Sequence, residues 1–144
     1  MSERIEARRT VRADRDAPGL IRALIEAFAQ EQHVSADDLS RVLIAVEELV
    51  TNIIKYGYDP GAPAGSIAVT VWTEGNRMGL GIVDDSNPFN PFVQPEPDLA
   101  EPLEKRRIGG LGLHLVKAIM DRTHYERVDS HNVVEISRRV TRGA

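Results

Sequence analysis

The chain has 144 residues, the size of one typical domain, and its 42% hydrophobic and 28% charged residues are ordinary for a globular protein. We therefore expect one domain over residues 1–144 and exclude disordered and fibrous proteins. The formal charge of -4 gives no general attraction for nucleic acid or anionic lipid, and the absence of cysteine excludes disulfides and thiolate zinc sites. Because no apolar run or apolar leader is present, we expect a cytoplasmic protein that binds neither membrane nor nucleic acid directly.

The first half of the chain has three regular hydrophobic patterns. Apolar residues alternate over Arg4–Arg12, which is typical of a strand at the edge of a sheet. After Pro18, apolar residues recur every three or four positions as far as Phe28 and predict an amphipathic helix. Ser35 begins a sequence that resembles a capping box, and the apolar stripe after it predicts a second helix that ends near Tyr56.

Shorter alternating segments follow. Ile67–Trp72 and Met78–Val83 are separated by a glycine-containing turn, so they predict an antiparallel hairpin. Two last strands are predicted around Tyr125–Val128 and Val133–Arg139, joined by a loop over residues 129–132.

A long loop and a third helix lie between these two pairs of strands. Five of the eight prolines fall between Asp85 and Ile108, too many for a regular element. A helix is predicted over Leu111–Asp121. Trp72 and the phenylalanines are expected in the core. The residues of the third helix expected to face the core are Leu111, Leu115, Ala118 and Ile119.

Hairpins grouped around three helices predict an α+β fold. We expect a two-layer α/β sandwich, in which three helices cover one face of a mostly antiparallel sheet. The lack of regular β-α-β alternation argues against a doubly wound parallel sheet.

A polar stripe on the second predicted helix is the first candidate site. Glu48 and Asn52 are four residues apart and Lys55 is three further on, so the three side chains lie on one side of the helix. The stripe borders the buried face, where an unpartnered carboxylate or amide would be costly. An exposed helical Glu–Lys pair explains the same spacing.

Two further candidates lie on either side of the long loop. Asp84 ends a strand, where its carboxylate either accepts a hydrogen bond from the exocyclic amine of a purine or caps amides in a turn. Gly109-Gly110-Leu111-Gly112 opens a helix whose free amides and dipole suit phosphate, although a glycine cluster also serves as a flexible joint. The chain contains neither a P-loop nor a dinucleotide-binding fingerprint.

In this order the three motifs resemble the N, G1 and G2 boxes of the GHKL, or Bergerat-type, ATP-binding superfamily. The motifs that carry the resemblance are Glu48-Leu49-Val50-Thr51-Asn52, Asp84-x-Ser86-x-Pro88 and Gly110-x-Gly112. The residues in these motifs, and the short length of the chain, are similar to those of the anti-sigma regulatory factor and serine-protein kinase branch. The resemblance covers nearly the whole chain.

The resemblance implies a role for each matching residue. Glu48 would be the catalytic base, and Asn52 the ligand of magnesium, a hard cation that prefers oxygen. Asp84 would read adenine beside Ser86, which stands where the superfamily usually has glycine. The other cofactor-binding residues implied are Lys55, Gly110, Gly112 and Leu113.

The loop from Asn87 to Ile108 would be the ATP lid, and Lys105, Arg106 and Arg107 at its end would close on the phosphates. A charged triplet is also typical of a solvated surface.

The implied function is that of an ATP- and magnesium-dependent anti-sigma factor and serine-protein kinase. Such a protein binds a sigma factor and phosphorylates a serine on an anti-sigma-factor antagonist, and its relatives commonly form homodimers. The alternative is a nucleotide-gated protein-binding switch with little or no kinase activity. A detached histidine-kinase catalytic domain is disfavoured because no phosphoacceptor helix pair is present.

Overall fold

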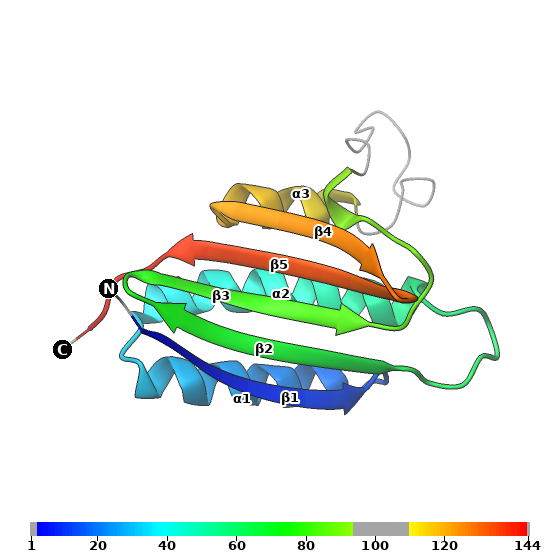
Figure 1. Ribbon diagram of the computed structural model, residues 1–144, viewed down its shortest axis with the longest axis horizontal. Coiled ribbons are helices and arrows are strands. Elements are labelled where there is room, and N and C mark those ends of the chain that lie inside the picture. Colours follow the sequence, from blue (N-terminus) through cyan, green and yellow to red (C-terminus); the bar gives the residue numbers. More distant parts are fainter. Residues whose placement is uncertain (1–2, 94–109, 144) are drawn as a thin grey trace.

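The computed structural model describes residues 3–93 and 110–143. A single strand is followed by two helices, then by a pair of strands, a third helix and a second pair of strands (Figure 1). In chain order the elements are β1 (Arg4–Arg12), α1 (Ala17–Glu31), α2 (Ala36–Tyr56), β2 (Ser66–Glu74), β3 (Arg77–Asp84), the 3-10 turn η1 (Pro91–Val93), α3 (Gly110–Ile119), β4 (Arg122–Val128) and β5 (His131–Arg139).

The described strands form one antiparallel sheet with the order β1-β2-β3-β5-β4. The predicted hairpin is present, and Gly75 takes a positive φ of 59° in its turn. A second hairpin joins β4 to β5 through Asp129 and Ser130, with φ of 47° and 66°, as two-residue turns of this hand require. β5 therefore begins at His131, earlier than the sequence predicted.

The three helices lie on one face of this sheet, which confirms the predicted two-layer α+β architecture (Figure 1). Ser35 caps α2, since its Oγ accepts a hydrogen bond from the Asp38 amide at 3.2 Å. The helix ends at Tyr56 as predicted. Gly57 follows with a φ of -81°, so the left-handed conformation is not the reason for glycine there. A Cβ at Gly57 would lie 2.7 Å from that of Ser86, so close packing requires the glycine.

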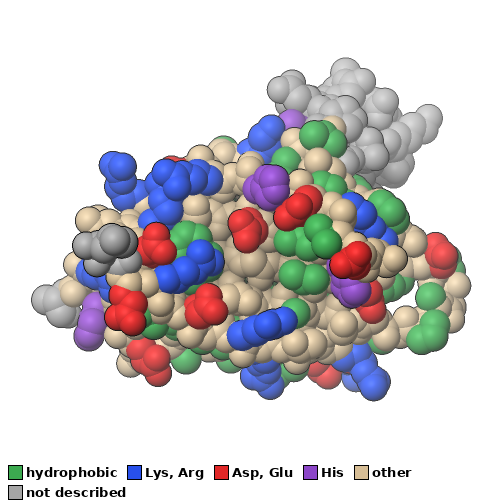
Figure 2. All heavy atoms as spheres, in the orientation of Figure 1, with side chains coloured by type: hydrophobic (Ala, Val, Ile, Leu, Met, Phe, Trp, Pro, Cys, Tyr) green, Lys and Arg blue, Asp and Glu red, His purple; other side chains and the backbone are tan. Residues whose placement is uncertain are grey.

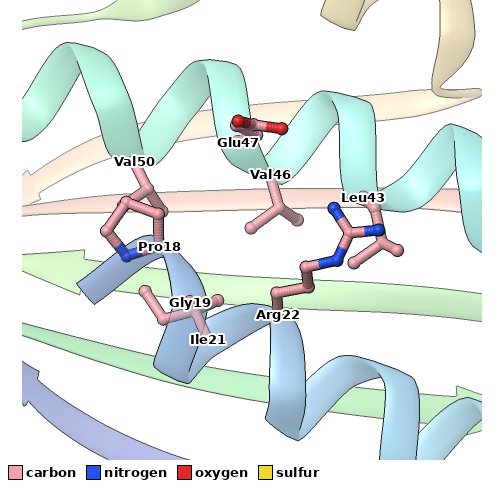
Figure 3. A pocket seen from close by; sticks show the side chains of 8 residues that line it. All are labelled: Pro18, Gly19, Ile21, Arg22, Leu43, Val46, Glu47 and Val50. Carbon is pink, nitrogen blue, oxygen red and sulfur yellow. The ribbon is translucent and has the colours of Figure 1, made fainter. Parts of the chain in front are cut away.

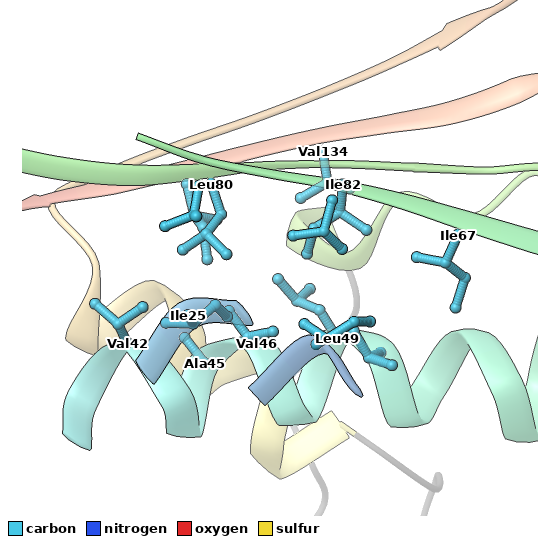
Figure 4. Close-up of a cluster of buried hydrophobic side chains, with 14 of the residues drawn as sticks. Ile25, Val42, Ala45, Val46, Leu49, Ile67, Leu80, Ile82 and Val134 are labelled. Atoms are coloured by element: carbon cyan, nitrogen blue, oxygen red, sulfur yellow. The ribbon is translucent and has the colours of Figure 1, made fainter. Parts of the chain in front are cut away.

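The core fills the space between the sheet and the helices (Figure 4). On β2 every second residue from Ile67 to Val71 is fully buried, because a strand points alternate side chains to opposite faces. Burial of each large aliphatic side chain stabilises the fold by roughly 1.5 to 3 kcal/mol. The labelled core residues are Ile25, Val42, Ala45, Val46, Leu49, Ile67, Leu80, Ile82 and Val134.

The buried face of α3 differs from the prediction. Leu113 and Val116 are buried, and so is Met120 just beyond the helix, whereas Leu115 is 46% exposed and Ala118 is exposed. The helix is apolar on several sides, so the 3.6-residue period is compatible with more than one buried face. Packing of α3 against α2 selects the face that contains Leu113 and Val116.

Trp72 is not a core residue, and that prediction is wrong. It lies between two inward-facing residues of β2 and so points to the outer face of the sheet. Its ring covers Gly79 and lies under the guanidinium of Arg4, whose Cζ is 4.3 Å from the ring centroid. Among the phenylalanines, Phe28 is fully in the core, whereas Phe89 is exposed.

A buried ion pair joins the start of α2 to the end of β5. Arg138 Nη2 lies 3.1 Å from Asp38 Oδ1, and Arg138 Nη1 donates to the Ile119 carbonyl at the end of α3. Asp38 Oδ2 accepts hydrogen bonds from the Thr141 amide at 2.8 Å and from Ser35 Oγ at 2.8 Å. Asp38 therefore connects the start of α2 with Arg138 at the end of β5 and with Thr141 just after β5.

Candidate functional site

Asp84 is the last residue of β3 and is 1% exposed. Its Oδ1 accepts hydrogen bonds from the Ser86 amide at 3.0 Å, from Ser86 Oγ, and from Asn132 Nδ2 at 3.1 Å. The turn-capping interpretation is therefore correct for this oxygen. No described residue donates to Oδ2, so the second oxygen is available to an N–H donor of a ligand.

Asn132 is a site residue that the sequence did not reveal. It is the second residue of β5, lies directly opposite Asp84 in the ladder, and is buried. Its Oδ1 accepts from the Tyr125 hydroxyl at 2.7 Å and from the Phe89 amide at 3.2 Å, while its Nδ2 lies 2.9 Å from the Asn87 carbonyl. The side chain thus holds the start of the long loop against Asp84. An asparagine beside a predicted turn gave no signal of this role, since turns commonly contain asparagine.

Ser86 occupies the position where glycine was expected, without strain. Its backbone is not in the left-handed region, and its side chain is buried against Gly57 at the end of α2. The Asn87 amide donates to the Gly57 carbonyl at 2.8 Å, and Arg127 Nη1 donates to the Ser86 carbonyl at 2.8 Å. These contacts anchor the first residues of the loop to both α2 and β4.

Asp85 points away from Asp84 and has a different set of partners. It accepts hydrogen bonds from the Tyr58 hydroxyl at 2.6 Å and the Ser66 amide at 3.0 Å. Burial raises the pKa of Asp85, but these hydrogen bonds and the nearby His131 outweigh it and hold the pKa below its usual value. Burial and the Asp85 carboxylate raise the pKa of Tyr58, so its hydroxyl stays a donor. Asp85 therefore fastens the loop before β2 to the end of β3.

Glu48 and Gly112 come together between α2 and α3. Glu48 is half-buried, and a Cβ at Gly112 would overlap its carboxylate. Only glycine allows α3 to approach the carboxylate this closely. The structure thus brings the predicted catalytic residue to the first turn of α3, where backbone amides lack partners within the helix.

Asn52 lies on α2 between the contact of Glu48 with Gly112 and the contact of Gly57 with Ser86. Its side chain is buried, and Nδ2 donates to the Glu48 carbonyl at 2.7 Å. Oδ1 accepts no hydrogen bond from the described residues. Gly57, the residue that follows α2, is nine positions after Glu48, which corresponds to about 14 Å along the helix axis, and Asn52 lies near the middle.

The remaining predicted residues are placed as follows. Lys55 is exposed in the last turn of α2, and no ion pair joins it to Glu48 within the described part of the chain. Gly110 begins α3, and the Leu113 side chain packs in the core, so only its backbone is able to face a ligand. Most of the predicted lid, including Lys105, Arg106 and Arg107, lies outside the described residues.

A separate groove of about 240 Å³ lies between α1 and α2 (Figure 3). Glu47, not Glu48, lines it, together with apolar residues such as Ile21 and Val46. None of the predicted site residues lines this groove, which lies on another side of α2.

No group of three or more His, Cys, Asp or Glu side chains within residues 3–93 and 110–143 is arranged to hold a metal ion. No helix in the same ranges is long and apolar enough to cross a membrane.

The antiparallel sheet under one layer of helices, with a buried carboxylate at a strand end beside a polar helix stripe, is a two-layer α+β architecture with a candidate ligand site. The chain belongs to the histidine kinase-like ATPase domain family, which matches it over residues 11–138. This match confirms the resemblance on which the motif interpretation depended.

Several curated relatives are named as protein kinases. The chain is 28% identical to the serine-protein kinase RsbW of Halalkalibacterium halodurans over 117 residues, which are 78% of this chain and 70% of the relative. It is 30% identical to RsbW of Bacillus cereus over 124 residues, covering 83% and 74% of the two chains. The serine/threonine-protein kinase BtrW of Bordetella bronchiseptica is 29% identical over 108 residues, 75% of each chain.

The fold is also similar to a solved structure. The crystal structure of the RsbU and RsbW domains of Rv1364c from Mycobacterium tuberculosis superposes with a TM-score of 0.69 at 17% identity. The match covers 97% of this chain but 34% of the longer one, and it confirms the fold.

Proposed function

We propose that the protein is an ATP- and magnesium-dependent serine-protein kinase of the anti-sigma type, which binds a sigma factor and phosphorylates a serine on an anti-sigma-factor antagonist. The observation that carries the proposal is the arrangement along α2. Gly57 contacts Ser86 beside Asp84 at one end, and Glu48 contacts Gly112 about 14 Å away. An extended nucleoside triphosphate has a comparable length.

In this proposal each group binds the part of ATP that suits its chemistry. Asp84 Oδ2 accepts a hydrogen bond from the adenine amine, because it accepts none from a described residue. The amides at the start of α3, from Gly110 to Leu113, donate to phosphate oxygens with the help of the helix dipole. Lys55 adds a positive charge near the end of α2.

Asn52 is the proposed magnesium ligand. Its Oδ1 has no donor among the described residues, and an amide oxygen is a suitable ligand for a hard cation. One protein ligand is enough for magnesium, which commonly keeps several waters and takes phosphate oxygens as its other ligands. When bound, the ion would neutralise charge on the phosphates.

Glu48 is the proposed general base. The serine oxygen forms a new bond to the γ-phosphorus, the bond to the β-phosphate oxygen breaks, and ADP leaves, while Glu48 takes the hydroxyl proton. The contact with Gly112 holds the carboxylate beside the amides that would bind the phosphates.

The test compares three variants in a transfer assay with labelled ATP, magnesium and the antagonist encoded nearest to the protein. Glu48→Gln is expected to keep ATP binding but to lower phosphoryl transfer by about 100- to 10,000-fold. Asn52→Ala is expected to lose the magnesium dependence of nucleotide binding. Glu47→Gln is the matched control, because Glu47 faces the α1–α2 groove, and its transfer rate is expected to stay near wild type.

The assay also separates the kinase from the alternative. If Glu48→Gln and Asn52→Ala both leave phosphorylation intact, the proposed mechanism is wrong. If the wild type transfers no phosphate while ATP changes its affinity for the sigma factor, the protein is a nucleotide-gated binding switch. Sedimentation equilibrium checks separately whether the chain forms the homodimer that the resemblance implies.

A further inference from the structure

An open depression of about 460 Å³ lies on the outer face of the sheet, at the end remote from Asp84. It is lined by Arg77, Arg122 and Arg139, together with Asn76. Basic side chains gather at the upper left of this face, over the start of β4 and the end of β5 (Figures 1 and 2). None of the residues proposed for nucleotide binding contributes to it.

The strand register brings the three arginines together. Arg77 on β3 is directly opposite Arg139 on β5. Arg122 on β4 is opposite Ser137, which makes it a diagonal neighbour of Arg139. Like charges directly opposite each other on neighbouring strands are destabilising. The sheet therefore keeps three adjacent cations at one end at a cost to stability.

The protein's own carboxylates compensate only part of this charge. Asp121 lies 3.9 Å from Arg77 Nη1, and it accepts a hydrogen bond from the Arg139 backbone amide at 2.6 Å. Glu74 is the register neighbour of Arg77 on the other side. The guanidinium groups of Arg122 and Arg139 have neither an ion pair nor a hydrogen bond with another residue in the described ranges.

We propose that this depression, the arginine depression, is a docking site for an acidic, carboxylate-rich segment of a protein partner. Guanidinium groups bind carboxylates through paired hydrogen bonds, and three of them spread over neighbouring strands match several carboxylates along an extended segment. The depression is open, so a single small anion would keep most of its water and gain little. Nucleic acid is disfavoured because the chain carries a net charge of -4.

The arginine depression is separate from the proposed nucleotide site. Arg77 and Asp84 are the first and last residues of β3, so they are about 23 Å apart along the strand. An acidic segment bound at the arginine depression would leave the proposed nucleotide site beside Asp84 accessible. The proposal therefore does not depend on the proposed kinase activity.

The test is fluorescence anisotropy of the full chain with a labelled oligoglutamate peptide, and with a glycine-serine peptide as the uncharged reference. The wild type is expected to bind oligoglutamate alone, with an affinity that falls as salt screens the charges. The double variant Arg122→Gln with Arg139→Gln is expected to lose about tenfold or more in affinity. The control is Arg8→Gln with Arg12→Gln, which removes the same charge from exposed positions on β1.

A smaller loss in the control than in the double variant, with the far-UV circular dichroism spectrum unchanged in both, supports the proposal. Equal losses in the two double variants would show an effect of net charge alone and overturn it. Failure of oligoglutamate to bind at low salt would overturn it as well. Displacement of the peptide by inorganic phosphate, with phosphate binding lost in the Arg122 and Arg139 variant, would replace it with a site for small oxyanions.

Discussion

Asp84 divides its two carboxylate oxygens between the fold and the proposed ligand. Oδ1 is held by Ser86 and Asn132, whereas Oδ2 receives no hydrogen bond from a described residue. Asp84→Asn is expected to weaken binding of adenine nucleotides by about 1 to 3 kcal/mol, because an amide nitrogen facing the adenine amine removes an acceptor. Isothermal titration calorimetry measures this change.

Asp85→Asn is the control for that measurement. Its carboxylate contacts Tyr58 and Ser66 instead, so nucleotide affinity is expected to stay close to wild type. Unchanged affinity in Asp84→Asn would remove Asp84 from the proposed adenine site.

Among the described glycines, Gly112 is the one where an added Cβ would come nearest to another side chain, the Glu48 carboxylate. Gly112→Ala places a methyl group onto the Glu48 carboxylate, so α3 or Glu48 has to move. We expect this variant to lose most phosphoryl transfer while the far-UV circular dichroism spectrum is retained, since a shift of about 1 Å can cost 100-fold. Gly19→Ala is the control, because nothing lies within 4 Å of a Cβ there, and alanine should slightly raise the melting temperature. Wild-type transfer in Gly112→Ala would contradict the proposed geometry.

At the scale of elements, Asp38 and Arg138 connect the start of α2 with α3 and β5. Asp38→Asn is expected to lower the free energy of unfolding by about 1 to 3 kcal/mol, because it leaves the partly buried Arg138 without its countercharge. Asp37→Asn is the matched control. Asp37 is in the same helical turn and pairs with Arg41 in solvent, so its loss should cost about 1 kcal/mol or less. Urea denaturation of both variants checks the difference.

The same pair predicts a pH dependence of stability. Burial raises the pKa of Asp38, but hydrogen bonds from Thr141 and Ser35 and the charge of Arg138 outweigh burial and lower it. The ionised carboxylate therefore stabilises the fold at any pH above the unfolded pKa of about 3.9, and this contribution is lost as the pH falls through the lower folded pKa. Asp38→Asn should make the melting temperature less dependent on pH in this acidic range. An equal slope in wild type and variant would show that Asp38 is not the group responsible.

At the scale of the whole molecule, nucleotide binding should raise thermal stability by mass action. Magnesium-ATP at about 100 times its Kd should add about 2.7 kcal/mol, which shifts the melting temperature by several degrees. GTP should give a much smaller shift at the same concentration, because guanine presents a carbonyl oxygen where adenine presents an amine, opposite the acceptor Asp84 Oδ2. Differential scanning fluorimetry makes the comparison, and equal shifts would contradict an adenine-reading role for Asp84.

The element types could be predicted from sequence because each has a local cause. Alternation over Arg4–Arg12 defines an edge strand, and the cap at Ser35 with the apolar stripe after it defines α2. The motifs that carry the family resemblance were also recognisable from sequence, since Glu48, Asn52 and Asp84 lie in short contiguous patterns. These features depend on spacing along the chain, which the amino-acid sequence alone determines.

Tertiary packing decided the features that depend on residues far apart in sequence. The α3 helix is apolar on several sides, and contact with α2 selects the face of Leu113 and Val116. Asn132 enters the site because β5 pairs with β3, which places it opposite Asp84 across 48 residues of sequence. The arginines from β3, β4 and β5 likewise meet only through strand register. Local periodicity contains no information about register between distant strands, so only the folded sheet could bring these side chains together.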